Sequence, residues 1–326
     1  MKAQDDPCLT RTVVVTAIET QGNPVKNLQA SDLAGKLHGQ PVQVVSLELT
    51  RRRPRIMVVL DMSGSMVAPD DRVWPITRMM LEDVVRLDSE AGQMGLALFG
   101  TEVFKLVGLS SDLYAVHKEV AALLRASAEN VSPMPERKTA LWDALWQAAD
   151  QLKPPVVGDV IYALTDGGDN HSKHTVEQLK ERLLHRGTRV FAFIPTADIL
   201  SRSRSPEDSS GPGILGDAVK VSGGSFISIC PDRRSENCQG ILPYFGNWIS
   251  RENRSVLLDA AHRLYQQMAV FYEVKVQLRS PVEKMEKFEI NAVDDRGHKR
   301  RDIDLLYPHR LPPCAGSSGN QSFATD

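Results

Sequence analysis

The sequence has few cysteines, no long apolar run and no excess of charge of one sign. Its four cysteines among 326 residues have no CxxC spacing, and no HxxxH spacing accompanies them, which argues against a zinc site. The longest apolar runs, such as 56–60, have the length of a strand, so no membrane span is expected. The formal net charge of −2, with both signs interspersed, gives no field that favours nucleic acid or an anionic membrane.

The placement of the cysteines is typical of a disulfide-containing protein. Cys230 and Cys238 flank a short polar loop, whereas Cys8 and Cys314 lie just outside the first and last expected strands. Two disulfides fit this arrangement, but four cysteines permit three pairings, and free thiols in a cytosolic protein are the alternative. The opening MKAQDD has the form of a mature terminus joined to a new start codon. We therefore expect an extracytoplasmic protein, secreted or periplasmic, whose export signal is absent from this chain.

From Arg55 onward the chain repeats an apolar strand, a polar or glycine-containing loop and a helical segment. This order, with strands apolar on both faces, predicts an α/β fold: a doubly wound, mainly parallel sheet with helices on both faces. The strand at 102–107 follows its neighbour so closely that we expect an antiparallel hairpin at the sheet edge. The other expected strands are 56–60, 94–99, 159–164, 189–194 and 225–229, and the expected helices are 76–90, 112–126, 139–152, 175–186 and 252–271.

The two ends of the chain resemble each other more than either resembles the middle. Residues 11–18 and 40–49 are rich in β-branched residues or alternate in polarity, as are 272–278 and 287–293. We expect these ends to form one small β domain into which the α/β domain is inserted; two independent hairpins are the alternative. The expected boundaries are 10–53 and 272–310 for the two parts of the β domain, 54–271 for the α/β domain and 311–326 for a flexible tail.

Two segments do not fit this scheme: 201–213 and 231–250. The first, SRSRSPEDSSGPG, is poor in apolar residues and is predicted to be a mobile loop. Its basic start at 201–205 and the RRR run at 51–53 raise nucleic acid binding as a hypothesis. Neither run is interleaved with aromatic residues, so a flexible loop and a solvated linker explain them better.

The most specific pattern follows the first strand of the α/β domain. In VVLDMSGSM, an apolar strand ends at Asp61 and places Ser63 and Ser65 on the following loop. A second apolar strand ends at Asp166 before two glycines, and Thr139 stands at the expected N-cap of a helix between them. Because ligands of open α/β sheets collect at the carboxyl ends of strands, we expect these five side chains on one rim.

These five side chains form an all-oxygen set of two carboxylates and three hydroxyls. Such a set suits a small hard cation with octahedral geometry, Mg²⁺, with Mn²⁺ as the next candidate. Because hydroxyls are neutral, at most two formal negative charges oppose the metal, which remains electrophilic. We therefore expect a metal-dependent protein-binding module, not an enzyme, whose partner protein supplies an Asp or Glu carboxylate.

The ordered pattern resembles the von Willebrand factor type A (vWA) family and its metal-ion-dependent adhesion site (MIDAS). All five family positions are filled here, by Asp61, Ser63, Ser65, Thr139 and Asp166. The resemblance implies that Asp61 and the serines ligate the metal, while Thr139 and Asp166 exchange direct and water-bridged contact. The flanks VVVTAIETQGNPVKNLQASDL and YEVKVQL are similar to those of vWA-related proteins of acidobacteria, which are usually exported, although the aromatic expected after SDL is missing.

A metal-dependent hydrolase that uses the same rim is the alternative function, with His171 or His174 as the base. No GxSxG motif is present, and a serine nucleophile would compete with metal ligation. A structural subunit with a vestigial site is a third possibility.

Nearby side chains have ordinary explanations. Asp169 and Asn170 fit a turn as well as a ligand contact, and Trp142 and Trp146 are expected to pack in the core.

Overall fold

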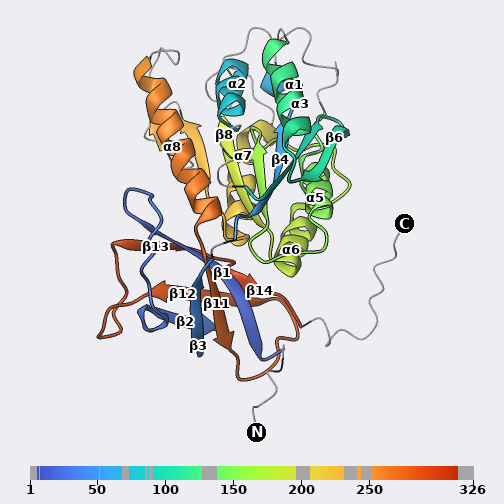
Figure 1. The fold of residues 1–326 in the computed structure, drawn as a ribbon. Coiled ribbons are helices and arrows are strands. Elements are labelled where there is room, and N and C mark those ends of the chain that lie inside the picture. Colours follow the sequence, from blue (N-terminus) through green and yellow to red (C-terminus); the bar gives the residue numbers. More distant parts are fainter. Residues whose placement is uncertain are drawn as a thin grey trace.

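The computed structural model describes most of the chain, and the architecture contains two seven-stranded sheets (Figure 1). One sheet is mainly parallel and carries the helices, and the other is antiparallel. The described residues are 6, 8–50, 52–67, 73–84, 87, 91–126, 138–195, 206–230, 241–243 and 251–314.

The central sheet has the strand order β10-β9-β8-β7-β4-β5-β6. Every neighbouring pair is parallel except β5 and β6, which are antiparallel, as the short connection between them predicts. The mainly parallel α/β sheet is therefore confirmed. Its strands are β4 (Arg55–Asp61), β5 (Gln93–Phe99), β6 (Val103–Ser110), β7 (Val160–Leu164), β8 (Arg189–Pro195), β9 (Phe226–Cys230) and β10 (Ile241–Pro243).

Helices cover both faces of this sheet because its strands are apolar on both faces. In β4, the alternate residues Ile56, Val58 and Leu60 pack toward α2, α3 and α8, while Met57 and Val59 pack toward α5, α6 and α7. All five are fully buried. The helices are α1 (Gly64–Val67), α2 (Val73–Val84), α3 (Tyr114–Arg125), α5 (Leu141–Gln151), α6 (Val176–Arg186), α7 (Pro206–Val221) and α8 (Arg251–Ala269).

Helix α7 corrects the sequence analysis, which predicted a mobile loop over 201–213. The helix begins at Pro206, a residue that suits the first helical position because its missing N–H is not needed there. Leu215 and Val219, four residues apart, then pack into the core against the sheet. The prediction failed because it weighed the Ser, Gly and Pro content and not the apolar face that follows. Residues 201–205 lie outside the described part.

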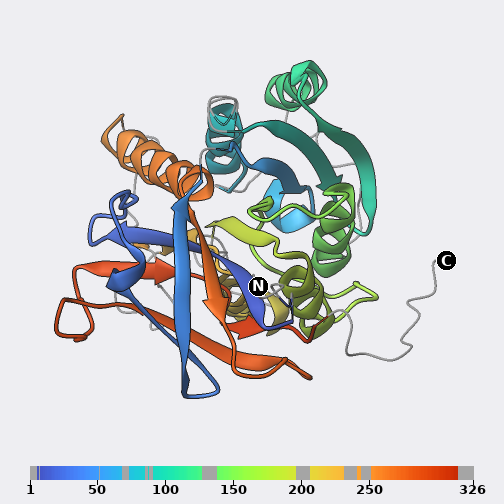
Figure 2. The ribbon, with the colours of Figure 1, turned by 60° about the horizontal axis from the view of Figure 1, so that its bottom comes forward.

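The flanks of the chain form the second sheet, with the order β13-β1-β11-β3-β2-β12-β14. Figure 2 shows the N-terminal strands in blue lying among the C-terminal strands in orange and red. With seven strands this sheet is larger than expected, and the exact domain boundaries stay a prediction. Its strands are β1 (Thr10–Glu19), β2 (Leu33–Leu37), β3 (Gln40–Leu49), β11 (Tyr272–Gln277), β12 (Glu286–Ala292), β13 (Ile303–Leu306) and β14 (Arg310–Leu311).

The chain enters and leaves the α/β part through two adjacent segments. Leu49 at the end of β3 pairs with Tyr272 at the start of β11, and the Thr50 N–H donates to the Phe271 carbonyl at 2.9 Å. Because β4 starts soon after this crossing, the amino ends of the parallel strands face the antiparallel sheet (Figure 1). Their carboxyl ends therefore form a rim on the opposite side of the α/β part.

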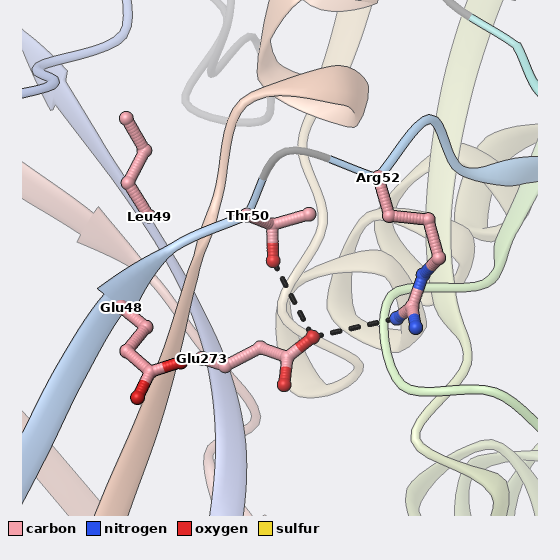
Figure 3. A pocket seen from close by; sticks show the side chains of 5 residues that line it. All are labelled: Glu48, Leu49, Thr50, Arg52 and Glu273. Atoms are coloured by element: carbon pink, nitrogen blue, oxygen red, sulfur yellow. Dashed lines mark hydrogen bonds and ion pairs between the residues drawn. The ribbon is translucent and has the colours of Figure 1, made fainter.

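A pocket of about 540 Å³ lies beside this crossing and is lined by Glu48, Leu49, Thr50, Arg52 and Glu273 (Figure 3). Both Arg52 and the Thr50 hydroxyl donate to Glu273 Oε1 at 3.4 Å, and Arg52 also donates to a backbone carbonyl of the α/β part. Arg52, which is exposed as a solvated linker predicts, thus also links the antiparallel sheet to a loop of the α/β part.

A disulfide joins Cys8 and Cys314, just outside the first and last strands. Of the three pairings that four cysteines permit, this bond selects the one in which Cys8 pairs with Cys314. Disulfides are typical of an oxidising compartment. The side chain of Cys230 and all of Cys238 lie outside the described residues. Within the described ranges, no helix is both long and apolar enough to cross a membrane.

Candidate metal centre

The first arm of the candidate site is the loop after β4. The Asp61 side chain is fully buried, and its Oδ1 accepts the Ser63 N–H at 2.8 Å. Ser63 Oγ lies 3.1 Å from Ser65 Oγ, so the two hydroxyls stand side by side. The alternation of Asp61, Ser63 and Ser65 in the sequence therefore gathers one carboxylate and two hydroxyls at the start of α1.

The second arm is the loop after β7, the strand that pairs with β4. Here the Thr165 hydroxyl donates to Asp61 Oδ2 at 2.6 Å and accepts the Gly167 N–H at 3.1 Å. Asp166 follows with 5% of its surface exposed, and its Oδ1 accepts the Gly168 N–H at 3.0 Å. Thr165 thereby fixes the orientation of the Asp61 carboxylate. Thr165 was not among the predicted site residues, although its position directly before Asp166 indicates that it lies at the same strand end.

A glycine contact holds the second arm against α7. Gly167 has a φ of 85°, and a Cβ at this position would lie 2.9 Å from the backbone of Gly211 in α7. A side chain at either position would push the loop away from the helix. Helix α7, which the sequence analysis did not expect, thus sets the position of the loop that carries Asp166.

Thr139, the fifth predicted ligand, precedes α5 and is 9% exposed. The N-cap residue of α5 is Ala140 and not Thr139 as predicted, and no side chain caps the helix from that position. The prediction was one residue early because a capping hydroxyl was assumed, whereas the Ala140 N–H donates to the Gly100 carbonyl at 2.8 Å. The Thr139 carbonyl accepts the N–H groups of Asn170 and His171 at 3.0 and 3.1 Å, which ties it to the second arm.

The two carboxylates of the site disfavour each other in their charged forms. Burial, followed by the negative charge of Asp166, raises the pKa of Asp61 to about 7, although hydrogen bonds from Thr165 and Ser63 act in the opposite direction. Two buried carboxylates within electrostatic reach of each other provide a place where a cation is favourable.

The donor set fits a hard divalent cation. Among the described residues, no group of three or more His, Cys, Asp or Glu side chains could hold a metal, so a zinc or calcium cage of that kind is not found. Hydroxyls from Ser63 and Ser65, with the carboxylates of Asp61 and Asp166, form instead an all-oxygen set of low charge. This chemistry suits Mg²⁺ or Mn²⁺.

The histidines and tryptophans near the candidate site lie in different environments. His174 Nδ1 lies 2.6 Å from Asp143 Oδ1, and the His174 ring stacks on Trp146 with a centroid distance of 3.9 Å. His171 is exposed. Trp142 is buried as predicted, and Trp146, which is half-buried, packs against the same core cluster while Arg182 lies over its ring.

The sequence matches no protein-family model and no curated protein. Among solved structures, the chain is similar to BatB, a conserved hypothetical protein from Bacteroides thetaiotaomicron, at 16% identity and a TM-score of 0.42, over 65% of this chain and 98% of that one. A von Willebrand factor type A protein from Catenulispora acidiphila aligns at 14% identity and a TM-score of 0.37, over 88% and 75% of the two chains.

A third similar structure is proximal thread matrix protein 1 from the mussel byssus, in a form with a zinc-occupied MIDAS motif. It aligns at 16% identity and a TM-score of 0.42, over 71% of this chain and half of that one. At these identities and TM-scores the likenesses carry no conclusion about this chain, whose candidate function rests on its own residues.

Proposed function

We propose that this protein is a metal-dependent protein-binding module of the vWA type. Its cation, Mg²⁺ or alternatively Mn²⁺, is held by Asp61, Ser63, Ser65, Thr139 and Asp166. The observation that supports the proposal best is the buried pair of carboxylates with adjacent serine hydroxyls at the carboxyl ends of β4 and β7. Ligand sites of open α/β sheets lie at this end of the strands.

The composition of the set favours recognition of an acidic group. Three of the five proposed ligands are neutral hydroxyls, so the protein supplies two negative charges at most. When bound, Mg²⁺ would supply an electrophilic centre that an external carboxylate can complete. The partner that this chemistry suits is a protein with an exposed Asp or Glu side chain or a chain terminus.

Binding is favoured over hydrolysis by the placement of the histidines. The ring of His174 lies against α5, where its Nδ1 contacts Asp143 and its face stacks on Trp146, and these contacts place it with the helix and not with the serine hydroxyls of the rim. His171, exposed beside Thr139, is the candidate base of the alternative hydrolase. Turnover of a generic ester or phosphate that disappears in His171→Ala would favour that alternative.

We further propose that the protein works in an oxidising, extracytoplasmic compartment. The disulfide between Cys8 and Cys314 supports this placement, because such bonds are rare in the cytosol.

Thermal unfolding with Mg²⁺ or with EDTA tests the metal proposal. We expect Mg²⁺ to raise the Tm of the parent, because a ligand that binds only the folded state stabilises it. Asp61→Ala should abolish this rise, whereas Asp302→Ala, which removes an exposed acid of the antiparallel sheet region, should retain it. A parent protein with the same Tm in Mg²⁺ and EDTA, at metal concentrations up to tens of millimolar, would contradict the proposal.

A peptide array tests the proposed partner chemistry. Peptides with Asp or Glu should be retained by the parent in Mg²⁺ and released by EDTA, and matched Asn or Gln peptides should not be retained. Retention that ignores EDTA would show that the carboxylate is not recognised through the metal.

A further inference from the structure

The first turn of α5 is held by side chains of the loop that follows Asp166. The N–H groups at a helix start have no partner within the helix and need acceptors from elsewhere. Here the Thr139 N–H donates to Asn170 Oδ1 at 2.9 Å, and the Trp142 N–H donates to Asp169 Oδ1 at 3.4 Å. The Asp143 N–H donates to Ser172 Oγ at 3.1 Å. The loop therefore caps the helix that Thr139 precedes.

A side chain of α5 in turn accepts hydrogen bonds from the backbone of the loop. Asp143 accepts the N–H groups of Lys173 and His174, both at 3.0 Å, and its Oδ1 also contacts the His174 ring. Burial alone would raise the pKa of Asp143, but these bonds outweigh it and the pKa is lowered. Asp143 is thus held as a charged acceptor between the helix and the loop.

A short hydrogen bond and an aromatic stack support the outer side of this arrangement. Ser172 Oγ donates to Asp169 Oδ1, which joins two of the three acceptors that receive the helix N–H groups. The ring of His174 stacks on Trp146, one helical turn after Asp143. We refer to Asp143, Asp169, Asn170, Ser172 and His174 together as the loop clasp.

The loop clasp connects two of the proposed metal ligands that are far apart in sequence. Thr139 lies just before α5. Asp166 lies 27 residues later, just before the loop that carries the other residues of the loop clasp. The position of the Thr139 hydroxyl relative to the Asp166 carboxylate therefore depends on how the loop is bound to the helix. Residues that orient metal ligands from behind affect metal affinity, with typical losses of about 10-fold to 100-fold when they are removed.

We propose that Asp143 and Asp169 are positioning residues of the metal site: through the loop clasp they hold Thr139 in place beside Asp166 without touching the metal. This inference rests on the proposed function, because it assigns a metal to the rim. It also explains why these acids, close to the rim, are bonded to backbone N–H groups and are not additional ligands.

Titration with Mn²⁺, followed by the electron paramagnetic resonance signal of free Mn²⁺, tests the inference in the full chain. Asp143→Ala should weaken Mn²⁺ binding about tenfold or more. Asp143→Asn retains one acceptor oxygen and should give an intermediate loss. The matched control is Asp150→Ala, which removes an acid from the same helix, two turns further on, that pairs with Arg182 and not with the loop. Its Mn²⁺ affinity should equal that of the parent.

Amide hydrogen exchange in EDTA provides a readout that does not need metal. In Asp143→Ala, exchange should accelerate in the peptides that contain Lys173 and His174 and in those that contain Thr139. Should Asp143→Ala fail to fold, Ser172→Ala removes the acceptor of the Asp143 N–H more gently and replaces it in both measurements.

The outcomes separate the two proposals. A parent that does not bind Mn²⁺ overturns both of them. A parent that binds Mn²⁺, together with an Asp143→Ala variant of lower Tm but unchanged Mn²⁺ affinity, overturns the positioning role and leaves the metal site standing.

Discussion

The carboxyl ends and the amino ends of the central strands hold buried charges of opposite character. At the carboxyl ends, Asp61 and Asp166 lie within electrostatic reach of each other, and burial together with the charge of Asp166 raises the pKa of Asp61 to about 7. At the amino ends, Arg55 makes two hydrogen bonds to the buried Asp159, at 2.8 and 2.6 Å. Like charges therefore meet at one end of the sheet and opposite charges at the other.

A second arginine completes the amino-end arrangement. Arg189 is 1% exposed and donates to the carbonyls of Met268 at 2.7 Å, Gln267 at 3.3 Å and Gly158 at 3.2 Å. Its guanidinium also lies 4.4 Å from the ring centre of Phe271. Two of these carbonyls belong to the last turn of α8, where helices lack internal donors. Arg189 thus joins the central sheet to the helix that leads into the antiparallel sheet.

Within one sheet, the amino ends of the strands therefore serve stability, and we assign function to the carboxyl ends. Proteins commonly retain destabilising charge arrangements at functional sites and satisfy charges elsewhere. On this basis, changes at the amino ends should lower stability and leave metal binding intact, and changes at the rim should do the reverse.

The largest effect is expected from Arg189→Ala. Removal of the guanidinium takes away the donor that Arg189 supplies to the buried carbonyls of Met268 and Gly158 and leaves a cavity against Phe271, and we expect the free energy of unfolding to fall by about 3 kcal/mol or more. Urea unfolding measures this loss. Arg300→Ala, which breaks an exposed pair with Asp302, serves as the control and should cost less than about 1 kcal/mol. A loss for Arg189→Ala as small as that of the control would remove the stability half of the comparison.

Loss of the disulfide between Cys8 and Cys314 should have the next largest effect. Replacement of both cysteines by serine frees the two ends of the chain, and we expect a loss of about 2–4 kcal/mol. Because the bond lies in the antiparallel sheet region, Mn²⁺ affinity at the rim should not change. A parallel loss of metal affinity would show that the two regions are not independent.

A smaller effect of opposite sign is expected from Asp61→Asn. Between about pH 4 and pH 7 the folded state retains the Asp61 proton that the unfolded chain has released, so the stability of the metal-free protein falls as the pH rises through this window. The amide has no charge to place beside Asp166, and in EDTA at pH 8 it should stabilise the protein by on the order of 1–2 kcal/mol. Urea unfolding of both proteins at pH 5 and pH 8 measures the difference, which should shrink at pH 5.

An Asp61→Asn variant less stable than the parent at pH 8 would count against this prediction. It would mean that the hydrogen bonds from Thr165 and Ser63 outweigh the repulsion from Asp166.

Most of the central fold could be predicted from the sequence, because its strands and helices have local patterns of apolar residues. Short apolar runs such as 56–60 and 160–164, each followed by a polar loop, favour buried strands, and the structure has β4 and β7 there. Helix α7 was missed because its start is rich in Ser, Gly and Pro and because its contact with Gly167 comes from a distant part of the chain. The pairing of the two flanks was expected, but not the extent of their sheet.

The residues of the candidate site that come directly after a strand could be predicted from the sequence. Asp61, Ser63 and Ser65 alternate directly after a strand, so their proximity is encoded in a few residues. Thr165 orients Asp61, about 100 residues away, and Asp143 binds the backbone of Lys173 and His174, about 30 residues away. The position of Thr165 before Asp166 places it at the strand end, but the partners of Thr165 and Asp143 depend on how β4, β7 and α5 are assembled.

The central claim, that the rim is a cation site, is tested most directly by Mn²⁺ titration of the parent and of Asp61→Asn, with Mg²⁺ as competitor. The account predicts one saturable Mn²⁺ site per chain in the parent, displaced by Mg²⁺ and lost in Asp61→Asn, although this variant is folded and, in EDTA, more stable. A parent without a saturable site, or an Asp61→Asn variant that binds Mn²⁺ as tightly as the parent, would contradict it.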